Sequence, residues 1–391
     1  MPAAPPATPL LDGMLVLDLA SVGPAARASR WLADYGAEVI KVGPMPRDGG
    51  VQITPPAYAY SAHRGMARMQ VDLKADAGRG AFLRLAASAD VVIESFRPGV
   101  VAKLGISFED VQAVNPGIVY CSTTGFGQDG PRSQWAGHDL NYLAAAGYLH
   151  TSGTNADGGP ALPGATVADS AAGGLHAVAA ICAALVGRAT TGTGVHLDVS
   201  IAEGTLSLMS LAVDEYFASG TEPGPRHGLL TGKYAWYDVY QTADDGWVAV
   251  GAIEGRFFDN LCRAIGCDQW VGKQYDDDIE AMRADFKAAF LTRGRDAWVD
   301  ELGPADTCVS AVQDIPELTQ DPQFTARGSF VEVEHPTEGA FRQVGGVLAG
   351  QTDATGMAIP DMTVTATRDL LVRAGMSGEE VEALMEQGAV G

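Results

Sequence analysis

Residues 14–42, MLVLDLASVGPAARASRWLADYGAEVIKV, decide the fold of the first part of this chain. Residues 14–19 form a short apolar run that is typical of a strand, and Pro24 follows at a position that suits the start of a helix. The helical pattern continues to Gly36, which supplies a left-handed stop, and residues 38–42 form a second strand-type run. A strand, a helix and a strand joined this closely make a βαβ unit, so the stretch predicts a parallel sheet.

The same alternation continues after that unit. Strand-type runs at residues 69–73, 91–94 and 118–123 alternate with helical patterns at residues 75–88 and 107–114. We therefore predict an α/β fold in which a large domain holds an open, mostly parallel, Rossmann-like sheet.

The character of the sequence changes near residue 218. Residues 219–226, SGTEPGPR, have the composition of a linker, and a predicted hairpin and several predicted helices follow it. We expect a small α+β domain over residues 227–335. The large α/β domain is expected over residues 1–218, completed by the C-terminal segment 336–391.

Acidic residues outnumber basic ones in this chain. It has 26 Lys plus Arg against 48 Asp plus Glu, and a formal net charge of −22. This charge would repel nucleic acid and anionic membrane surfaces, so we expect neither as a partner. If the ligand is itself an anion, a local cluster of basic residues must meet its charge.

The cysteines and the apolar runs bear on the cellular compartment. The chain has five cysteines and no C-x-x-C pair, which predicts neither a disulfide framework nor a zinc site. No charged and apolar leader opens the chain, and the longest uncharged run, residues 170–187, suits a buried helix better than a membrane span. We therefore expect a cytoplasmic protein.

Basic residues occur where the predicted strands end. Arg64, Lys74, Arg97 and Lys103 lie at or near the loops that follow those strands, and such loops carry function in open α/β sheets. They form the local basic cluster that an anionic ligand requires. Ordinary surface cations remain the alternative for each of them.

A glycine-rich stretch follows one of the predicted strands. Residues 125–130 match the pattern G-x-G-x-x-G, but Pro131 and a polar run stand where the helix of a dinucleotide site would begin. An acidic ribose ligand at a suitable distance is also missing. We interpret the stretch as a tightly turned active-site loop rather than a nicotinamide or flavin site.

His138 comes shortly after this loop. Apolar residues follow it at helical spacing, so His138 is expected at or just before the first turn of a helix. The positive end of the helix dipole disfavours a second positive charge, which keeps an imidazole neutral near pH 7 and able to accept a proton. His138 is therefore a candidate general base, and simple helix capping is the alternative.

Two carboxylates also stand at predicted helix entrances. Asp169 opens the long apolar helix over residues 170–187, and capping by itself could explain it. Glu254 lies where the second strand of the predicted hairpin passes into a helix, which suits a cap or a surface charge. His176, inside the long helix, is expected to be a core histidine rather than a ligand.

Longer motifs resemble the class III CoA-transferase superfamily, and most of all its α-methylacyl-CoA racemase branch. The resemblance covers nearly the whole chain and is carried by LADYGAEVIKV (32–42), VDLK (71–74), FRPGV (96–100), TGFGQDGP (124–131), LDVS (197–200) and the C-terminal residues 377–390. Two motifs are similar to the racemase branch in particular: GHDLNY (137–142) to its catalytic-histidine segment, and VGAIE (250–254) to its active-site glutamate segment.

The resemblance implies an activity and a site. His138 and Asp169 would be two bases that flank the α-carbon of an acyl-CoA, and Glu254 would hold and polarise His138. The large domain would bind CoA, through the residues Arg64, Lys74, Arg97, Lys103, Asp139 and Tyr142. The family also implies an interlocked homodimer, whose active site lies between the large domain of one subunit and the small domain of the other.

The chemistry of a thioester suits these residues. A thioester acidifies its α-hydrogen because the carbanion is delocalised as an enolate, and inversion needs a base on one face and an acid on the other. We therefore predict an isomerase of lipid metabolism, a racemase or epimerase of 2-methylacyl-CoA thioesters. It would need no metal or redox cofactor, because CoA enters as part of the substrate.

Two alternatives stay open. A class III CoA-transferase would use Asp169 as a nucleophile that attacks the thioester and forms a mixed anhydride. A non-catalytic acyl-CoA-binding scaffold would keep the fold without the chemistry. Three places also depart from the racemase pattern. Pro44 replaces an arginine that contacts the nucleotide, Ala168 replaces the glycine before Asp169, and residues 230–237 replace a Gly-rich segment expected near the acyl chain.

Overall fold

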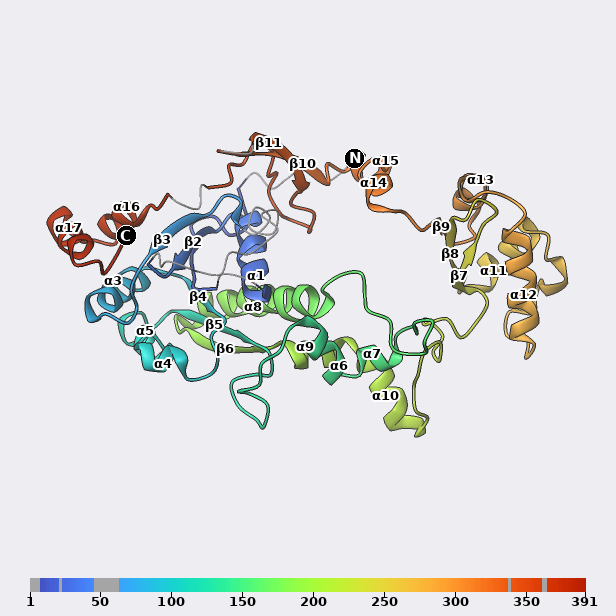
Figure 1. Cartoon of the computed structure of the whole chain (residues 1–391), viewed down its shortest axis with the longest axis horizontal. Helices are drawn as coiled ribbons and strands as arrows, with labels where there is room; N and C mark the ends of the chain where they lie inside the picture. Colours follow the sequence, from blue (N-terminus) through green and yellow to red (C-terminus); the bar gives the residue numbers. More distant parts are fainter. Residues whose placement is uncertain (1–7, 21–22, 46–62, 337–338, 361–363) are drawn as a thin grey trace. The chain divides into compact units, whose positions relative to one another are not determined.

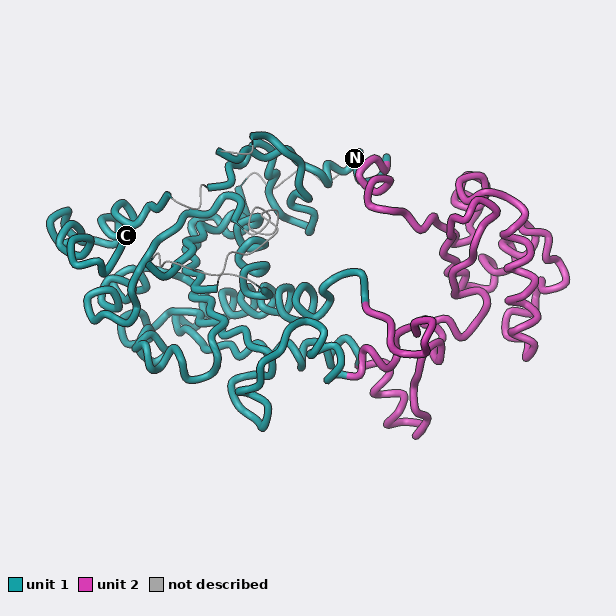
Figure 2. The backbone as a smooth tube through the Cα atoms, in the orientation of Figure 1, with its two compact units in different colours: residues 1–146, 163–209, 322–391 teal, residues 147–162, 210–321 magenta. Residues whose placement is uncertain are grey.

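The structure is a computed structural model of the 391-residue chain (Figure 1), and it describes residues 8–20, 23–45, 63–336, 339–360 and 364–391. The chain divides into two compact units, each with its own hydrophobic core (Figure 2). Unit 1 comprises residues 1–146, 163–209 and 322–391, and unit 2 comprises residues 147–162 and 210–321.

Unit 1 is built on a six-stranded sheet in the order β3-β2-β1-β4-β5-β6, and every neighbouring pair is parallel. Its strands are β1 (Leu15–Asp18), β2 (Glu38–Gly43), β3 (Ala67–Gln70), β4 (Val91–Glu94), β5 (Val119–Thr124) and β6 (Val195–Ser200). The strand order reverses between β1 and β4, as in doubly wound sheets. The predicted α/β fold with an open parallel sheet is confirmed.

Helices cover both faces of this sheet. They are α1 (Gly23–Asp34), α3 (Asp76–Ala86), α4 (Val100–Leu104), α5 (Phe108–Val114), α6 (Asp139–Ala145), the π-helix η1 (Ala168–Leu175), α8 (His176–Thr191), α9 (Ile201–Leu208), α15 (Pro322–Ala326), α16 (Thr367–Arg373) and α17 (Gly378–Glu386). Two six-residue strands, β10 (Phe330–His335) and β11 (Gly339–Val344), form a separate antiparallel hairpin in this unit.

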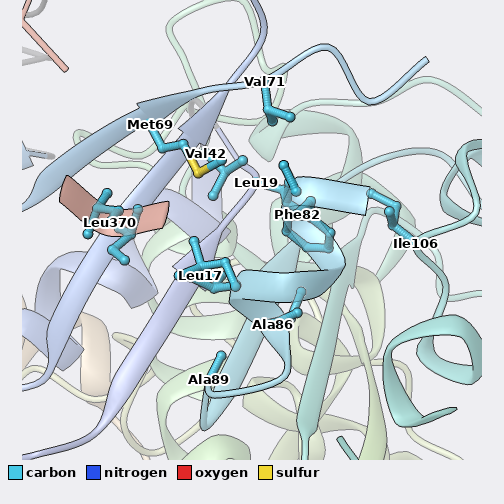
Figure 3. Packing of buried hydrophobic residues seen from close by; sticks show 14 of the residues in the cluster. Leu17, Leu19, Val42, Met69, Val71, Phe82, Ala86, Ala89, Ile106 and Leu370 are labelled. Atoms are coloured by element: carbon cyan, nitrogen blue, oxygen red, sulfur yellow. The ribbon is translucent and has the colours of Figure 1, made fainter. Parts of the chain in front are cut away.

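One face of the sheet packs against α3 and the C-terminal helices. Leu17, Val42 and Met69 come from three neighbouring strands, and Figure 3 shows them packed with Phe82 of α3 and Leu370 of α16. The opposite face packs against α1 and α8. Because both faces are covered, the central strands β1 and β4 are mostly apolar and almost fully buried, and such apolar runs are recognisable in the sequence.

Unit 2 contains a three-stranded antiparallel sheet of β7 (Tyr237–Gln241), β8 (Trp247–Gly251) and β9 (Val309–Ala311). Its helices are α7 (Tyr148–Thr151), α10 (Ser210–Ser219), α11 (Gly255–Ala264), α12 (Ile279–Phe290), α13 (Arg295–Leu302) and α14 (Ile315–Leu318), with short 3₁₀ turns at Asp268–Trp270 and Gly303–Ala305. The hairpin and the helices that follow it agree with the sequence prediction. Strand β9 was not expected, since three residues are too few to show an alternating pattern.

The unit bounds differ from those expected from composition. Residues 147–162 and α10 group with unit 2, and residues 322–335 group with unit 1. The stretch before the predicted linker forms two helices, α9 and α10, which meet at Met209. The sequence boundary was placed at a polar linker, because composition shows where such a linker lies. The units of the structure are instead defined by which segments pack together.

The long apolar stretch after Val167 differs from the expectation of one buried helix. It begins as the π-helix η1 and continues as α8, and the expected core residue His176 is exposed. Residues 168–191 are long and apolar enough to cross a membrane by length and composition, and only a third of the most apolar window is buried. One side packs on α1 and the sheet, and the other side is open in the single chain. The cytoplasmic location stays a prediction.

Candidate functional site

His138 stands at the entrance of α6, as the sequence predicted. Its backbone is extended (φ −127°, ψ 177°), and its N–H donates to the Asn141 side-chain oxygen at 3.0 Å. Leu143 on the inner side of α6 is fully buried and anchors the helix. The His138 side chain itself is exposed. An imidazole is thus held at an accessible helix entrance.

Tyr142 ties this entrance to the glycine-rich loop. Its hydroxyl donates to the Gly137 carbonyl oxygen at 2.6 Å, and the ring is buried, which raises the pKa of Tyr142. A Cβ atom at Gly125 or at Gly137 would lie within 2.8 Å of this ring, so both positions require glycine. Tyr142 therefore fixes the segment before His138, and its predicted contact with CoA stays a prediction.

Asp169 lies in the first turn of η1 rather than at its N-cap. The N-cap is Val167, one position before the helix begins, so the alternative that Asp169 simply caps the helix is wrong. The helix starts earlier than the apolar pattern indicated, at Ala168. The Ser170 N–H already donates to the Thr166 carbonyl oxygen at 2.9 Å.

The body of η1 is locked between α1 and α9 by glycines. A Cβ atom at Gly173 would meet the Pro24 ring, and one at Gly174 would meet the Trp31 ring. A Cβ atom at Gly204 of α9 would meet the carbonyl group of Ala172. The absence of side chains at these positions lets three helices approach closely, and this fixes the backbone that carries Asp169.

The entrances of α6 and η1 meet at Asp139. The Asp139 carboxylate accepts the Asp169 backbone N–H at 2.8 Å. Burial raises the pKa of the Asp169 carboxyl group, the charge of Asp139 raises it further, and the charges of Arg27 and His138 lower it. His138, Asp139 and Asp169 are thus brought together within unit 1.

Arg27 of α1 belongs to the same neighbourhood but was not predicted. Its guanidinium Nη2 donates to the Thr166 hydroxyl at 2.8 Å, just before η1 begins. An arginine in an alanine-rich helix carries no motif, so only the packing of α1 on η1 reveals its place.

This arrangement has definite chemical capacities. A carboxyl group with a raised pKa and a neighbouring imidazole are two proton carriers of different kinds, which suits acid and base roles at one site. The same carboxylate could also attack an electrophilic carbonyl carbon. Both capacities depend on Asp169.

Glu254 lies in unit 2, as the N-cap of α11. Its backbone is extended and its side chain is exposed. Burial is the largest cause of the raised pKa of Cys308, and the charge of Glu254 is the next. The expected position at a helix entrance is confirmed. Its pairing with His138, which belongs to unit 1, stays a prediction.

Unit 2 also contains a cavity of about 490 Å³ on its antiparallel sheet. The segment 230–237, which departs from the racemase pattern, contributes Leu230, Thr231, Gly232 and Tyr237 to the lining. Cys308 lines the same cavity and so links it to the neighbourhood of Glu254.

Arg64 does not belong to an exposed basic cluster. Its side chain is fully buried, and its guanidinium Nη2 pairs with Asp34 Oδ1 at 2.7 Å while Nη1 donates to the Val344 carbonyl oxygen at 3.0 Å. The alternative of an ordinary surface cation is therefore wrong for Arg64. Its predicted contact with CoA is not supported by this position, because a buried aspartate of α1 needs its charge. Lys74, Arg97 and Lys103 are exposed, and their contact with phosphate stays a prediction.

The glycine-rich loop is a tight turn and not a phosphate-cradling helix start. Gly127 has a positive φ of 84°, and the Gln128 N–H donates to Asp198 of β6 at 2.9 Å. The next helix, α6, begins only at Asp139. Within the described parts of the chain, no group of three or more His, Cys, Asp or Glu side chains could share a metal ion.

A family model described as CoA-transferase family III matches residues 11–360 of the chain. The chain belongs to this family.

Relatives of this family III chain have different printed activities. Alpha-methylacyl-CoA racemase from Homo sapiens is 34% identical over 83% of this chain and 83% of its own length. Acetyl-CoA:oxalate CoA-transferase from Acetobacter aceti is 31% identical over 82% of this chain and 85% of its own length. Family membership therefore establishes an enzyme of the CoA-transferase and racemase superfamily but leaves the reaction open.

Solved structures agree with the fold of this family III chain. A CAIB/BAIF family protein from Brucella suis has a TM-score of 0.74 and 27% identity, over 94% of this chain and 99% of its own. A protein from Mycobacterium tuberculosis has a TM-score of 0.78 and 26% identity over the same shares of the two chains.

Proposed function

We propose that this family III protein is a racemase or epimerase of 2-methylacyl-CoA thioesters that works by two-base 1,1-proton transfer through an enolate. The observation that carries the proposal is the bond from the Asp169 N–H to Asp139, the residue after His138, which joins the entrances of α6 and η1. A transferase needs the carboxylate alone, whereas inversion of a carbon centre needs two proton carriers.

In this mechanism one group removes the α-proton from one face and the conjugate acid of the other returns a proton to the opposite face. A raised pKa lets the Asp169 carboxyl group hold a proton at higher pH than an exposed aspartate, so it can act as acid in one direction and as base in the other. Each positioned proton carrier contributes roughly 10²- to 10⁴-fold to such a step. Backbone N–H groups near His138 and Asp139 would stabilise the enolate oxygen.

The CoA phosphates would bind to Lys74, Arg97 and Lys103. These cations are exposed at or after the carboxyl ends of the strands, in a protein that otherwise has a net charge of −22. Arg64 is not proposed as a phosphate ligand, because its charge is already neutralised by Asp34 in a buried ion pair.

We also propose that the enzyme is a homodimer in which Glu254 of one subunit holds His138 of the other. Large apolar side chains stand exposed on the helices that would take part: Val186 of α8 is 73% exposed, Leu211 of α10 is 69% exposed and Phe217 of α10 is 78% exposed. Exposed apolar surface of this extent is typical of an association surface. Light scattering on the purified protein tests the expected dimer mass.

A CoA-transferase is the second candidate function. It is supported by relatives of that printed activity, among them succinyl-CoA:glutarate CoA-transferase from Homo sapiens, 29% identical over 84% of this chain. Asp169 would then attack the thioester and form a mixed anhydride with release of the CoA thiolate. The thiolate would attack the aspartyl carbonyl carbon, which gives an aspartyl-CoA thioester and frees the first acid, and a second carboxylate would reverse both steps to become the new thioester. The imidazole of His138 has no evident task in that route.

Incubation in D₂O separates these functions. The protein is mixed with one enantiomer of a 2-methylacyl-CoA and no acceptor acid. The racemase exchanges the α-hydrogen for deuterium and removes the optical activity. If CoA moves only after a carboxylic acid is supplied, and no α-exchange occurs, the transferase is correct and the racemase is wrong. Binding of CoA without exchange or transfer for any thioester of a 2-methylacyl panel would leave only the non-catalytic scaffold.

A further inference from the structure

Asp139 reaches across the site to a helix that is not its own. Its carboxylate accepts the backbone N–H of Asp169, a residue 30 positions further along the chain. We propose that Asp139 is a positioning residue, which holds the first turn of η1 against α6 and so fixes the Asp169 carboxyl group beside His138. The inference rests on the proposed function, because it is there that Asp169 has a catalytic role.

The bond meets a specific need of η1. The N–H groups in the first turn of a helix have no partner within the helix, and a polar N-cap side chain usually serves one of them. Here the N-cap is Val167, whose side chain has no acceptor atom. The acceptor for Asp169 therefore comes from another helix, and Asp139 acts as a remote cap.

Asp139 makes a side-chain bond between two elements that also pack against each other. The entrance of α6 is held by the bond from His138 N–H to Asn141 and by the bond from Tyr142 to Gly137. The body of η1 is held by its close glycine contacts with α1 and α9. The Asp139 bond links these two parts at the residues proposed for catalysis.

The charge of Asp139 adds a second effect. Burial is the largest reason for the raised pKa of Asp169, and the charge of Asp139 on α6 is the next. Arg27 on α1 and His138 at the entrance of α6 act in the opposite direction, and Tyr142 of α6 also senses the Asp169 charge. Removal of the Asp139 charge alone therefore lowers the pKa of Asp169.

Two substitutions separate position from charge. Asp139→Asn keeps an oxygen that can accept the Asp169 N–H but removes the charge, and Asp139→Ala removes both. A matched control is Asp244→Ala, because the exposed Asp244 accepts the N–H of Arg295 at 3.0 Å across 51 positions at the entrance of α13. Asp244 is a remote cap of the same kind and is not a residue of the proposed site.

The first measurement needs no substrate. Hydrogen exchange of the Asp169 amide is followed by NMR on protein with selectively ¹⁵N-labelled aspartate, and the signal is assigned by its loss in Asp169→Asn. We expect faster exchange in Asp139→Ala and wild-type exchange in Asp139→Asn and in the control. In ¹³C titrations of the Asp169 carboxyl group, Asp139→Asn should titrate at lower pH than the wild type.

The second measurement uses α-proton exchange. Asp139→Ala should lower kcat on the order of 10²-fold, the effect of a misplacement of about 1 Å, with an unchanged KM and an unchanged Kd for free CoA. Asp139→Asn should keep most of the wild-type kcat. In its profile of kcat against pH, the limb that reports the ionisation of Asp169 should move to lower pH.

Several outcomes would overturn the proposal. Wild-type amide exchange in Asp139→Ala would show that the bond does not hold η1, and a raised Kd for CoA with an unchanged kcat would make Asp139 a CoA contact instead. If Asp139→Ala does not fold, the Asp169 amide of the wild type decides, because an N–H that Asp139 holds must be protected; exchange at the rate of an exposed amide overturns the proposal. A wild-type protein without α-proton exchange disproves the proposed function, whereas the two substrate-free measurements still decide the role of Asp139.

Discussion

At the scale of single residues, Asp169 is the group on which both candidate reactions depend. It is half-buried near Asp139, Arg27 and His138, and burial is the largest cause of its raised pKa. His138, in contrast, is exposed at its helix entrance. The two groups therefore differ in environment as well as in chemistry, which is what a pair of opposed proton carriers requires.

Loss of either group should affect the two enantiomers differently. We expect His138→Ala and Asp169→Ala each to abolish racemisation, because inversion needs both faces. Exchange from one enantiomer should survive in part in at least one of the variants, since the remaining base can still remove the proton that it faces. Exchange in D₂O is measured for each enantiomer separately, and the losses should be roughly 10²- to 10⁴-fold. Full activity in both variants would disprove the two-base assignment.

The raised pKa of Asp169 also predicts a pH-dependent effect on stability. A carboxyl group whose pKa is higher in the folded state than in the unfolded state binds its proton more tightly when folded. Its contribution to stability is therefore fully present at low pH and is lost as the pH rises through the folded pKa. Asp169→Asn should raise Tm at pH 8 more than at pH 4, as measured by calorimetry. An equal change at both pH values would contradict this.

At the scale of elements, the site depends on helices packed without side chains between them. The π-helix η1 lies in contact with α1 and α9 at Gly173, Gly174 and Gly204. π-helices are rare in proteins, and those that occur are often found at functional sites. The close packing supplies the rigidity that such an unusual turn needs.

Gly204→Ala tests this packing. The added methyl group would overlap the carbonyl group of Ala172, so we expect a loss of about 1–3 kcal/mol in the free energy of unfolding, together with a lower rate of α-proton exchange. Gly187→Ala is the matched control, because a Cβ atom at Gly187 in α8 meets nothing within 4 Å. That control should be neutral or stabilise by about 0.5–1 kcal/mol, since alanine favours helices. Urea unfolding measures both, and equal effects would mean that the contact is not tight.

At the scale of the whole molecule, a strongly acidic protein is proposed to bind an anionic substrate. The net charge of −22 repels CoA at long range, so binding must rely on a few local cations. Lys74, Arg97 and Lys103 are the exposed cations that remain after Arg64 is assigned to its buried ion pair.

Substitution of these cations should weaken the binding of CoA but not of its phosphate-free part. Lys74→Gln, Arg97→Gln and Lys103→Gln are each expected to raise the Kd for CoA by a factor of about 1.5–5, which corresponds to ~0.2–1 kcal/mol for an exposed charge pair. Calorimetric titration with CoA and with pantetheine separates the two contributions. Lys287→Gln, on an exposed position of α12, serves as the control. Equal losses for CoA and pantetheine would place these residues away from the phosphates.

The sequence by itself determined the local features of this protein. The apolar runs gave the parallel strands, and capping patterns placed Ser107, His138 and Glu254 at helix entrances, where the structure has them. These features depend on residues within about four positions of one another, so they are visible in the order of the residues.

Only the tertiary structure decided which of these residues act together. In the structure the Asp139 carboxylate accepts the backbone N–H of Asp169, and Arg27 lies near that site. Arg64 forms a buried ion pair with Asp34. The structure also contains the hairpin of β10 and β11, and apolar residues of α8 are exposed on one side of that helix. Each of these facts depends on contacts between distant segments, whose energy is set by packing and burial, and a local pattern carries no record of them.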